Sequence, residues 1–276
     1  MLFINNIPVT PIQFPDKTPK LDLSETQHAL NATDNLIRWN YESDAEMIWL
    51  YYITKHIRNR YPKAALYLHM PYVPNARFDR VKDEDEVFTL KYFAEFINGL
   101  EFDAVYTLDV HSNVSSALFD HIIDRKPIPQ IKQVLSVLKY QYKSDDLCLF
   151  FPDEGAMKRY SEIAGLFDLP YVFGSKNRDW KTGEILSLDI CNPSGIDLKG
   201  KTILIVDDIC SKGGTFYHSA KKLKEFEPKA IYLYVSHCEN TIAEGELLSS
   251  DLIQKIFTTD SLLTMKHDKI QVLKLS

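Results

Sequence analysis

The feature that most constrains the fold is a regular alternation of short apolar runs with longer segments whose apolar residues recur at helical spacing. Strands are expected at 64–70, 104–110, 147–151, 171–173, 202–206 and 230–236. Helices are expected at 45–58, 86–98, 156–167 and 216–226. Strands that alternate with helices imply parallel sheets covered on both faces. The sequence therefore predicts an α/β fold whose ligands bind at the carboxyl ends of the strands.

Length and composition indicate a two-domain globular protein. The chain has 276 residues, 45% of them hydrophobic and 25% charged, and the proline-containing stretch 125–130 is the expected boundary between domains 1–128 and 129–276. The net charge of −6 argues against a nucleic-acid partner. Four cysteines without metal-ligand spacing, and apolar runs too short to span a membrane, favour a cytoplasmic protein without disulfides.

Residues 203–215 combine the features of a sugar-phosphate site. The apolar strand 203–206 leads directly into Asp207 and Asp208, and then into Ser211, Lys212, Gly213, Gly214 and Thr215 at the start of a helix. Two glycines allow a tight turn that presents backbone N–H groups, and the helix adds its positive dipole end, so an anion fits there. The acidic pair suits sugar hydroxyls or a Mg²⁺-bound ligand. The competing interpretation is an ordinary strand-to-helix turn whose glycines serve geometry alone.

A neighbouring stretch, 195–202, matches the P-loop pattern G-x-x-x-x-G-K-[ST] residue for residue. That pattern binds phosphate only where it follows a strand and opens a helix, whereas this match leads into the strand 203–206. We therefore reject it as a phosphate site.

Several motifs resemble those of one enzyme family. Residues 206–215 resemble the ribose-phosphate loop shared by type I phosphoribosyltransferases and PRPP synthetases (ribose-phosphate diphosphokinases). Residues 71–80, Pro-Tyr-Val-Pro-Asn-Ala-Arg-Phe-Asp-Arg, are similar to the synthetases' Pro-Tyr-x-x-x-Ala-Arg-Gln-Asp-Arg ATP segment, which the transferases lack. Further similarities follow in the family's order at 108–111, 119–120, 152–155 and 176–178. The resemblance implies two type I phosphoribosyltransferase-like domains, each a mostly parallel sheet flanked by helices, with the last residues as candidates to pack back on the first domain.

The resemblance also implies a reaction, in which Mg-ATP donates pyrophosphate to the anomeric hydroxyl of ribose 5-phosphate, giving PRPP and AMP. The expected catalytic residues are Lys176, Arg178 and His111, because cations neutralise charge on a transferred phosphoryl group and an imidazole can act as a base. The expected ATP contacts are Phe14, Asp16, Arg77, Phe78 and Asp79. The expected sugar-phosphate contacts are Asp207, Asp208, Ser211, Lys212, Gly213, Gly214 and Thr215. The expected metal-site residues are His111, Asp109, Asp153 and Asp120, although Asp153 could instead cap the helix that follows it.

The chain also departs from the family pattern. Phe78 replaces a Gln, the segment 14–18 differs from the family's adenine-contacting loop, and the region before Phe14 is short, so the first βα unit is expected to be reduced. Ser211 and Lys212 make the sugar loop more positive, which leaves ADP-ribose, and hence NAD metabolism, open as the acceptor in place of ribose 5-phosphate. The sequence also leaves open a phosphoribosyltransferase or a non-catalytic regulatory relative. The expected partners are small-molecule substrates and further copies of the chain, as a dimer or a hexamer.

Overall fold

The computed structural model describes residues 1–178 and 185–275, without the side chains of residues 176–188. The chain divides into two compact units, Met1–Lys126 and Pro127–Ser276. Each unit contains one main sheet, and most neighbouring strands in both sheets are parallel. The predicted α/β class is therefore confirmed. In the described part of the chain, no helix is long and apolar enough to cross a membrane.

The main sheet of the first unit has the strand order β2-β1-β5-β6-β7-β8. Its strands are β1 (Leu2–Ile4), β2 (Ile7–Val9), β5 (Asp34–Trp39), β6 (Ala65–His69), β7 (Ala104–Leu108) and β8 (Ile122–Arg125). Strands β5 to β8 are parallel to one another, whereas β1 is antiparallel to both of its neighbours. Strands β3 (Ile12–Gln13) and β4 (Pro19–Lys20) form a separate two-stranded sheet.

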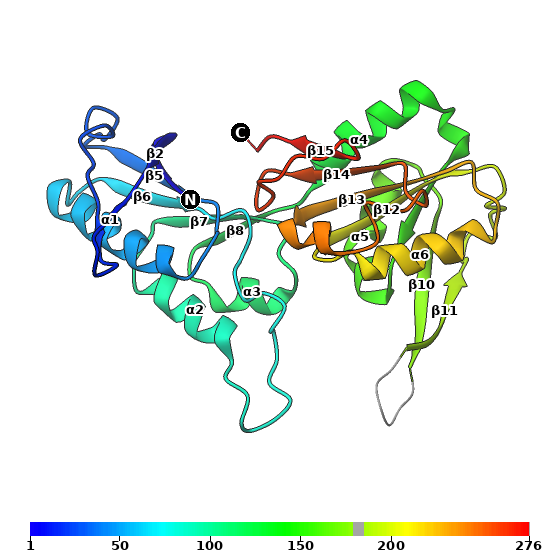
Figure 1. Cartoon of the computed structure of the whole chain (residues 1–276), viewed down its shortest axis with the longest axis horizontal. Coiled ribbons are helices and arrows are strands. Elements are labelled where there is room, and N and C mark those ends of the chain that lie inside the picture. Colours follow the sequence, from blue (N-terminus) through cyan, green and yellow to red (C-terminus); the bar gives the residue numbers. More distant parts are fainter. Residues whose placement is uncertain (179–184, 276) are drawn as a thin grey trace. The chain divides into compact units, whose positions relative to one another are not determined.

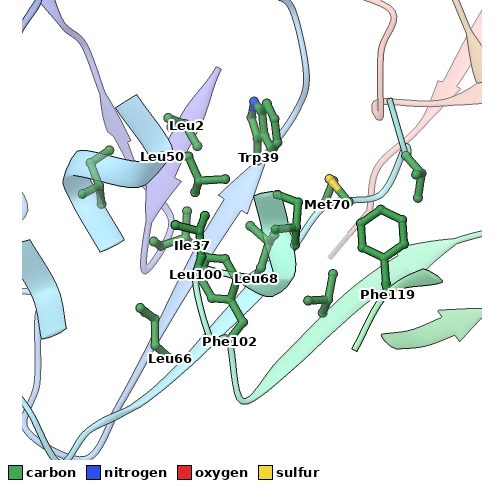
Figure 2. Packing of buried hydrophobic residues seen from close by; sticks show 14 of the residues in the cluster. Leu2, Ile37, Trp39, Leu50, Leu66, Leu68, Met70, Leu100, Phe102 and Phe119 are labelled. Carbon is green, nitrogen blue, oxygen red and sulfur yellow. The ribbon is translucent and has the colours of Figure 1, made fainter. Parts of the chain in front are cut away.

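Three helices of the first unit, α1 (Ala45–Arg60), α2 (Thr89–Asn98) and α3 (Asn113–Leu118), lie on one face of its sheet (Figure 1). This arrangement follows from the topology, because β5 to β8 are added in chain order and right-handed crossovers then place every helix on the same side. The expectation of helices on both faces is wrong for this unit. The hydrophobic core lies between the sheet and these helices. Alternate strand residues are buried there, among them Ile37, Trp39, Leu66 and Leu68 (Figure 2).

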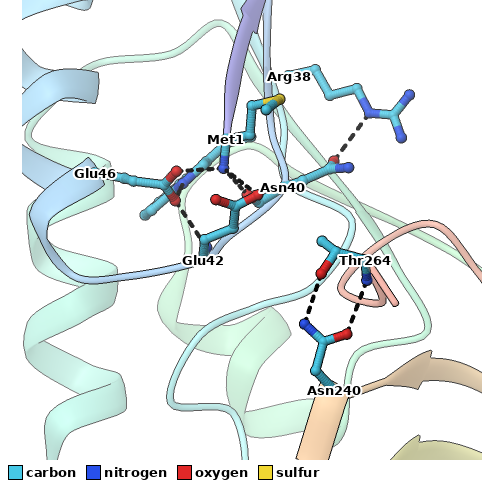
Figure 3. Close-up of polar contacts among 8 residues, drawn as sticks. Met1, Arg38, Asn40, Glu42, Glu46, Asn240 and Thr264 are labelled. Carbon is cyan, nitrogen blue, oxygen red and sulfur yellow. Dashed lines mark hydrogen bonds and ion pairs between the residues drawn. The ribbon is translucent and has the colours of Figure 1, made fainter. Parts of the chain in front are cut away.

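A buried carboxylate joins the end of β5 to the start of α1. Glu46 accepts hydrogen bonds from Trp39 Nε1 at 2.8 Å and from the backbone N–H of Glu42 at 2.9 Å. Its other oxygen forms an ion pair with the amino group of Met1 (Figure 3). The charge of Glu46 is therefore compensated although the side chain is buried.

The sheet of the second unit has the strand order β11-β10-β9-β12-β13-β14-β15, and only the β10–β11 pair is antiparallel. Its strands are β9 (Leu147–Phe151), β10 (Tyr171–Arg178), β11 (Ile185–Cys191), β12 (Thr202–Cys210), β13 (Ala230–Cys238), β14 (Lys255–Thr259) and β15 (Ile270–Leu273). Its helices are α4 (Ile128–Gln141), α5 (Glu154–Leu166) and α6 (Gly214–Lys224). Short 3-10 turns lie at Ser144–Asp146 and Asn240–Glu244.

The central strand β12 buries both of its faces. Leu204 and Val206 belong to the core that contains residues of α4 and α5, whereas Ile203 and Ile205 belong to the core that contains residues of α6. Helices therefore cover both faces of this sheet, as expected from the continuous apolar run of the strand. β12 also extends to Cys210, beyond the expected end at Val206, because its pairing with β13 continues past the apolar run. Residues 195–200, which contain a turn at 199–200, lead into β12 and not into a helix, which confirms the rejection of the P-loop match.

Candidate functional site

A loop between β12 and α6 has the geometry of an anion site, and we call residues 211–215 the anion loop. Gly213 caps α6 in the left-handed conformation, with φ of 80° and ψ of 10°. Glycine adopts this conformation without the steric cost that a side chain would add. The first N–H groups of α6 have no partner inside the helix and carry its positive dipole end. The helix begins at Gly214, two residues before the expected range of 216–226.

The two acids before the anion loop are neighbours near the end of β12, and they are buried to different degrees. Asp208 is 3% exposed, and its Oδ1 lies 2.9 Å from Nη1 of Arg159 on α5. Asp207 is half-buried, and its Oδ1 accepts a hydrogen bond from the backbone N–H of Asp208 at 3.0 Å. Burial, followed by the charge of Asp208, raises the pKa of Asp207 well above its ordinary value of 3.8. The adjacent acids therefore have different environments, and it is Asp208 that pairs with α5.

Side chains of the anion loop differ in how they are held. Within the described part of the chain, the buried Ser211 Oγ has no hydrogen-bond partner. Thr215 is exposed. Lys212 is 67% exposed, and its Nζ lies 2.9 Å from Oε2 of Glu244. The positive charge that Lys212 was expected to add to the loop is therefore offset by a carboxylate from outside the motif.

The expected ATP segment of the first unit begins at the carboxyl end of β6. The carbonyl oxygen of Pro71 accepts a hydrogen bond from the backbone N–H of Leu108 at 2.9 Å, so the segment continues beside β7. It turns at Asn75, where φ is 63°, and Arg77 is exposed just beyond the turn. Phe78 packs edge-to-face against Phe88 with 6.4 Å between ring centroids. This part of the segment therefore has a defined shape that presents Arg77 to solvent.

Asp109 and His111 follow β7 at the same edge of the sheet. Asp109 is 1% exposed, has a positive φ of 50°, and donates its N–H to the carbonyl of Arg125 at 2.8 Å. The carboxylate of Asp124 accepts a hydrogen bond from the backbone N–H of Val110 at 3.2 Å. His111 is half-buried and lies between this anchored turn and α3. Because β6 and β7 are parallel neighbours, the segment of Arg77 and the turn of His111 lie along one edge.

Asp120, an expected metal ligand, lies at the opposite edge of the same sheet. The residue after it, His121, accepts a hydrogen bond from the backbone N–H of Val105 at the start of β7. Asp109 follows the other end of β7, so the length of this strand, roughly 13 Å, separates Asp109 from the turn of Asp120 and His121. The grouping of Asp120 with Asp109 and His111 is therefore wrong, because α3 carries the chain back across the sheet before Asp120.

Two further expected ATP contacts, Phe14 and Asp16, lie in the turn of the small sheet β3–β4. Phe14 is exposed, and Asp16 accepts hydrogen bonds from the Oγ1 of Thr18 at 2.6 Å and from its backbone N–H at 3.0 Å. These hydrogen bonds, led by that of the Thr18 hydroxyl, lower the pKa of Asp16. Asp16 therefore stabilises its own turn, whatever else it contacts.

Asp153 and the pair Lys176 and Arg178 complete the expected site in the second unit. Asp153 follows β9 and caps α5, accepting a hydrogen bond from the backbone N–H of Ala156 at 3.0 Å. Its capping role is therefore confirmed. The backbone of Lys176 and Arg178 lies in β10 and pairs with β11. Their side chains lie outside the described residues.

The donors present fit the way Mg²⁺ binds together with a nucleotide. Within the described residues, no group of three or more His, Cys, Asp or Glu side chains is placed to hold a metal ion. Mg²⁺ usually keeps several waters and binds through one or two carboxylates and the substrate's phosphates. Single carboxylates such as Asp109 and Asp153 at strand ends suit that mode and do not suit a protein-only cage.

Three residues that shape the anion loop did not stand out in the sequence: Arg159, Glu244 and Gly245. Arg159 lies on α5 and reaches Asp208 through tertiary packing, so no sequence spacing could have revealed it. Glu244 and Gly245 follow β13, and they meet the loop because β12 and β13 are paired. The only signal in the sequence was a glycine within a polar loop, which usually marks a turn.

Parts of the chain are similar to known proteins. A family model described as a phosphoribosyl transferase domain matches residues 128–262. A ribose-phosphate pyrophosphokinase of Pyrococcus furiosus is 30% identical over 185 residues, which cover 64% of this chain and 60% of that protein. A ribose-phosphate pyrophosphokinase of Cereibacter sphaeroides is 28% identical over 193 residues, which cover 70% of this chain and 56% of that protein. The matched stretch thus spans about three fifths of these relatives.

A solved structure is similar over almost the whole chain. The phosphoribosylpyrophosphate synthetase from Mycobacterium smegmatis superimposes with a TM-score of 0.75, covering 97% of this chain and 86% of that protein at 18% identity. At this identity the likeness concerns the fold. Residues 128–262 therefore match a phosphoribosyl transferase domain, part of the chain is similar to ribose-phosphate pyrophosphokinases, and the fold is similar to that of a phosphoribosylpyrophosphate synthetase.

Proposed function

We propose that this protein transfers pyrophosphate from ATP to the anomeric hydroxyl of ribose 5-phosphate, giving PRPP and AMP. The observation that carries the proposal is the hydrogen bond between Leu108 and Pro71, which aligns the segment of Arg77 with the turn of His111. A phosphoribosyltransferase would need the anion loop but no such ATP segment. Relatives named ribose-phosphate pyrophosphokinase support the same reaction.

Residues of both units have proposed roles in the reaction. The anion loop of the second unit holds the 5′-phosphate through backbone N–H groups, and Asp207 accepts hydrogen bonds from sugar hydroxyls. Arg77 in the first unit contacts the ATP phosphates. His111 accepts the proton of the attacking hydroxyl, and Lys176 and Arg178 stabilise charge on the transferred group. Mg²⁺, when bound with ATP, supplies positive charge to the phosphates.

The proposed step is a single in-line displacement. The anomeric oxygen forms a bond to the β-phosphorus of ATP, and the bond between that phosphorus and the oxygen bridging to the α-phosphate breaks. The proton of the hydroxyl passes to His111, and the bridging oxygen leaves with AMP. Alignment of the two substrates provides most of the rate enhancement in such reactions.

An assay with Mg-ATP and ribose 5-phosphate tests the function directly. We expect AMP release that depends on the sugar, together with a ³¹P NMR signal of a pyrophosphate on the sugar carbon. AMP release without sugar, or no AMP from the folded protein with this sugar, contradicts the proposal. Consumption of PRPP on addition of a purine base would point to a phosphoribosyltransferase instead.

Substitution of the proposed base gives a first prediction. We expect His111→Ala to lower kcat by about 10²- to 10⁴-fold, because general-base catalysis contributes that much. The exposed His28 provides a matched control, and His28→Ala should keep wild-type kcat. Thermal unfolding of both variants checks that the fold is intact. Unchanged AMP production by a folded His111→Ala protein would contradict the role of His111.

A larger acceptor is a second candidate for the same chemistry. Lys212 is largely exposed at the rim of the anion loop, where it could meet a second phosphate attached to the first. ADP-ribose has such a second phosphate. The assay with ADP-ribose in place of ribose 5-phosphate decides between the acceptors through the ratio of their kcat/KM values. A higher kcat/KM for ribose 5-phosphate removes this candidate.

A further inference from the structure

A short segment after β13 lies against the backbone of the anion loop, and we call residues 244–247 the brace. If a Cβ were added to Gly245, it would lie 1.8 Å from the carbonyl oxygen of Lys212. A Cβ on Gly213 would lie 2.9 Å from Cδ2 of Leu247. Glu244 adds the ion pair with Lys212. The brace therefore contacts the loop at two consecutive residues, through both backbone and side chains.

Gly245 is required for close approach and not for its backbone angles. Its φ of −100° and ψ of 177° are extended values that any residue adopts. The nearest atom is a backbone oxygen, which cannot move aside as a flexible side chain could. Glycine at this position therefore makes room for the carbonyl of Lys212.

The direction of that carbonyl fixes the direction of the next N–H group. In a trans peptide the C=O and the following N–H point in opposite directions. The Lys212 carbonyl points at Gly245, so the N–H of Gly213 points away from Gly245. An anion is attracted by an N–H group and repelled by a carbonyl oxygen, so a flip of this peptide would convert a donor into a repelling group.

The turn that leads into the brace is itself anchored, at Glu239 and Asn240. The backbone N–H of Glu239 donates to the carbonyl of Cys210 at 2.8 Å. The side chain of Asn240 contacts Thr264 through two hydrogen bonds (Figure 3). Leu247 is buried in the core of this unit. A rigid support of this kind is needed if a loop backbone is to hold its N–H groups in one orientation.

We propose that Gly245 is a positioning residue for the 5′-phosphate: by admitting the Lys212 carbonyl, the brace keeps the Gly213 N–H facing the bound anion. This inference rests on the proposed sugar-phosphate role of the anion loop. It assigns a function to a residue outside the loop motif.

The test compares Gly245→Ala with Gly165→Ala. Gly165 lies in α5, and a Cβ there would meet no atom within 4 Å, so the same chemical change is harmless. We expect Gly245→Ala to raise the KM for ribose 5-phosphate about tenfold or more, since small misplacements of a binding group have such effects. The KM for ATP should stay within twofold of wild type, and Gly165→Ala should change neither constant. An unchanged sugar KM in folded Gly245→Ala protein overturns the proposal.

A measurement on the wild-type protein covers the case in which Gly245→Ala does not fold. Titration with ribose 5-phosphate, followed by amide NMR, should shift the Gly213 N–H resonance downfield, because that group faces the anion. Binding that leaves this resonance in place overturns the proposed orientation. The titration does not depend on turnover, so the two proposals can fail separately. Absence of AMP production contradicts the proposed reaction, whereas the shift of the Gly213 resonance decides the orientation of its N–H group.

Discussion

At the scale of single residues, Asp207 and Asp208 show that adjacent acids of one motif can have different roles. Asp208 forms an ion pair with Arg159 inside the protein, so it holds the end of β12 against α5. Asp207 is held in a partly buried position near the charge of Asp208. Burial of a carboxylate without a full counter-charge costs free energy, which is typical of a group kept for function.

This difference predicts that two conservative substitutions affect different properties, one the stability of the protein and the other the binding of the sugar. We expect Asp208→Asn to lower the free energy of unfolding by about 3 kcal/mol, because it removes the buried carboxylate that pairs with Arg159. Asp207→Asn should not destabilise the protein but should raise the KM for the sugar. Urea unfolding measures the first effect and steady-state kinetics the second. Equal losses of stability in both variants would contradict the division of roles.

The raised pKa of Asp207 also predicts a pH dependence. The folded state keeps a proton on Asp207 that the unfolded state releases near the ordinary pKa of 3.8. The protonated Asp207 therefore contributes its full stabilisation of the folded state below that pH. This contribution is lost as the pH rises through the pKa that Asp207 has in the folded state. The stability of Asp207→Asn relative to wild type should increase across this window and then level off. Urea unfolding at several pH values checks this, and a constant difference would contradict it.

At the scale of elements, the junction of β5 and α1 depends on Glu46. Its carboxylate accepts a buried hydrogen bond from the indole of Trp39 and a partly buried one from the backbone N–H of Glu42. We expect Glu46→Ala to lower the free energy of unfolding by about 2–3 kcal/mol, because both donors lose their acceptor. Glu42→Ala is a matched control, since that side chain is half exposed and should cost under about 0.5 kcal/mol. Chemical denaturation compares them, and equal losses would contradict this account.

At the scale of the whole molecule, the proposed substrates are assigned to different units. Arg77 belongs to the first unit and Thr215 to the second, and both side chains are exposed. We expect Arg77→Ala to raise the KM for ATP about tenfold and Thr215→Ala to raise the KM for the sugar by a similar factor, because each loses a hydrogen bond to a charged phosphate. The exposed Arg60 serves as a control. Steady-state kinetics with each substrate varied in turn measure both KM values in each variant. If Arg77→Ala raised the KM for the sugar and Thr215→Ala raised the KM for ATP, the assignment of substrates to units would be contradicted.

The sequence by itself determined the α/β class, the strand that leads into the anion loop, and the edge at which that loop lies. These features are local, because apolar periodicity, glycine and the strand-to-helix order act within a few residues. It also indicated the segments of Arg77 and His111, since each directly follows an apolar strand. The sequence could not place Asp120, because only the path of α3 shows that the chain has crossed back over the sheet.

Only the tertiary structure decided which residues support the anion loop. Arg159 reaches Asp208 from α5, and Gly245 reaches Lys212 from the turn after β13. The order of Asp207 and Asp208 along β12 is local, but the partner of Asp208 is set by the packing of α5 against the sheet. Local chemistry therefore determined what the loop can bind, whereas long-range packing decided which backbone and side-chain groups are held in position to bind it.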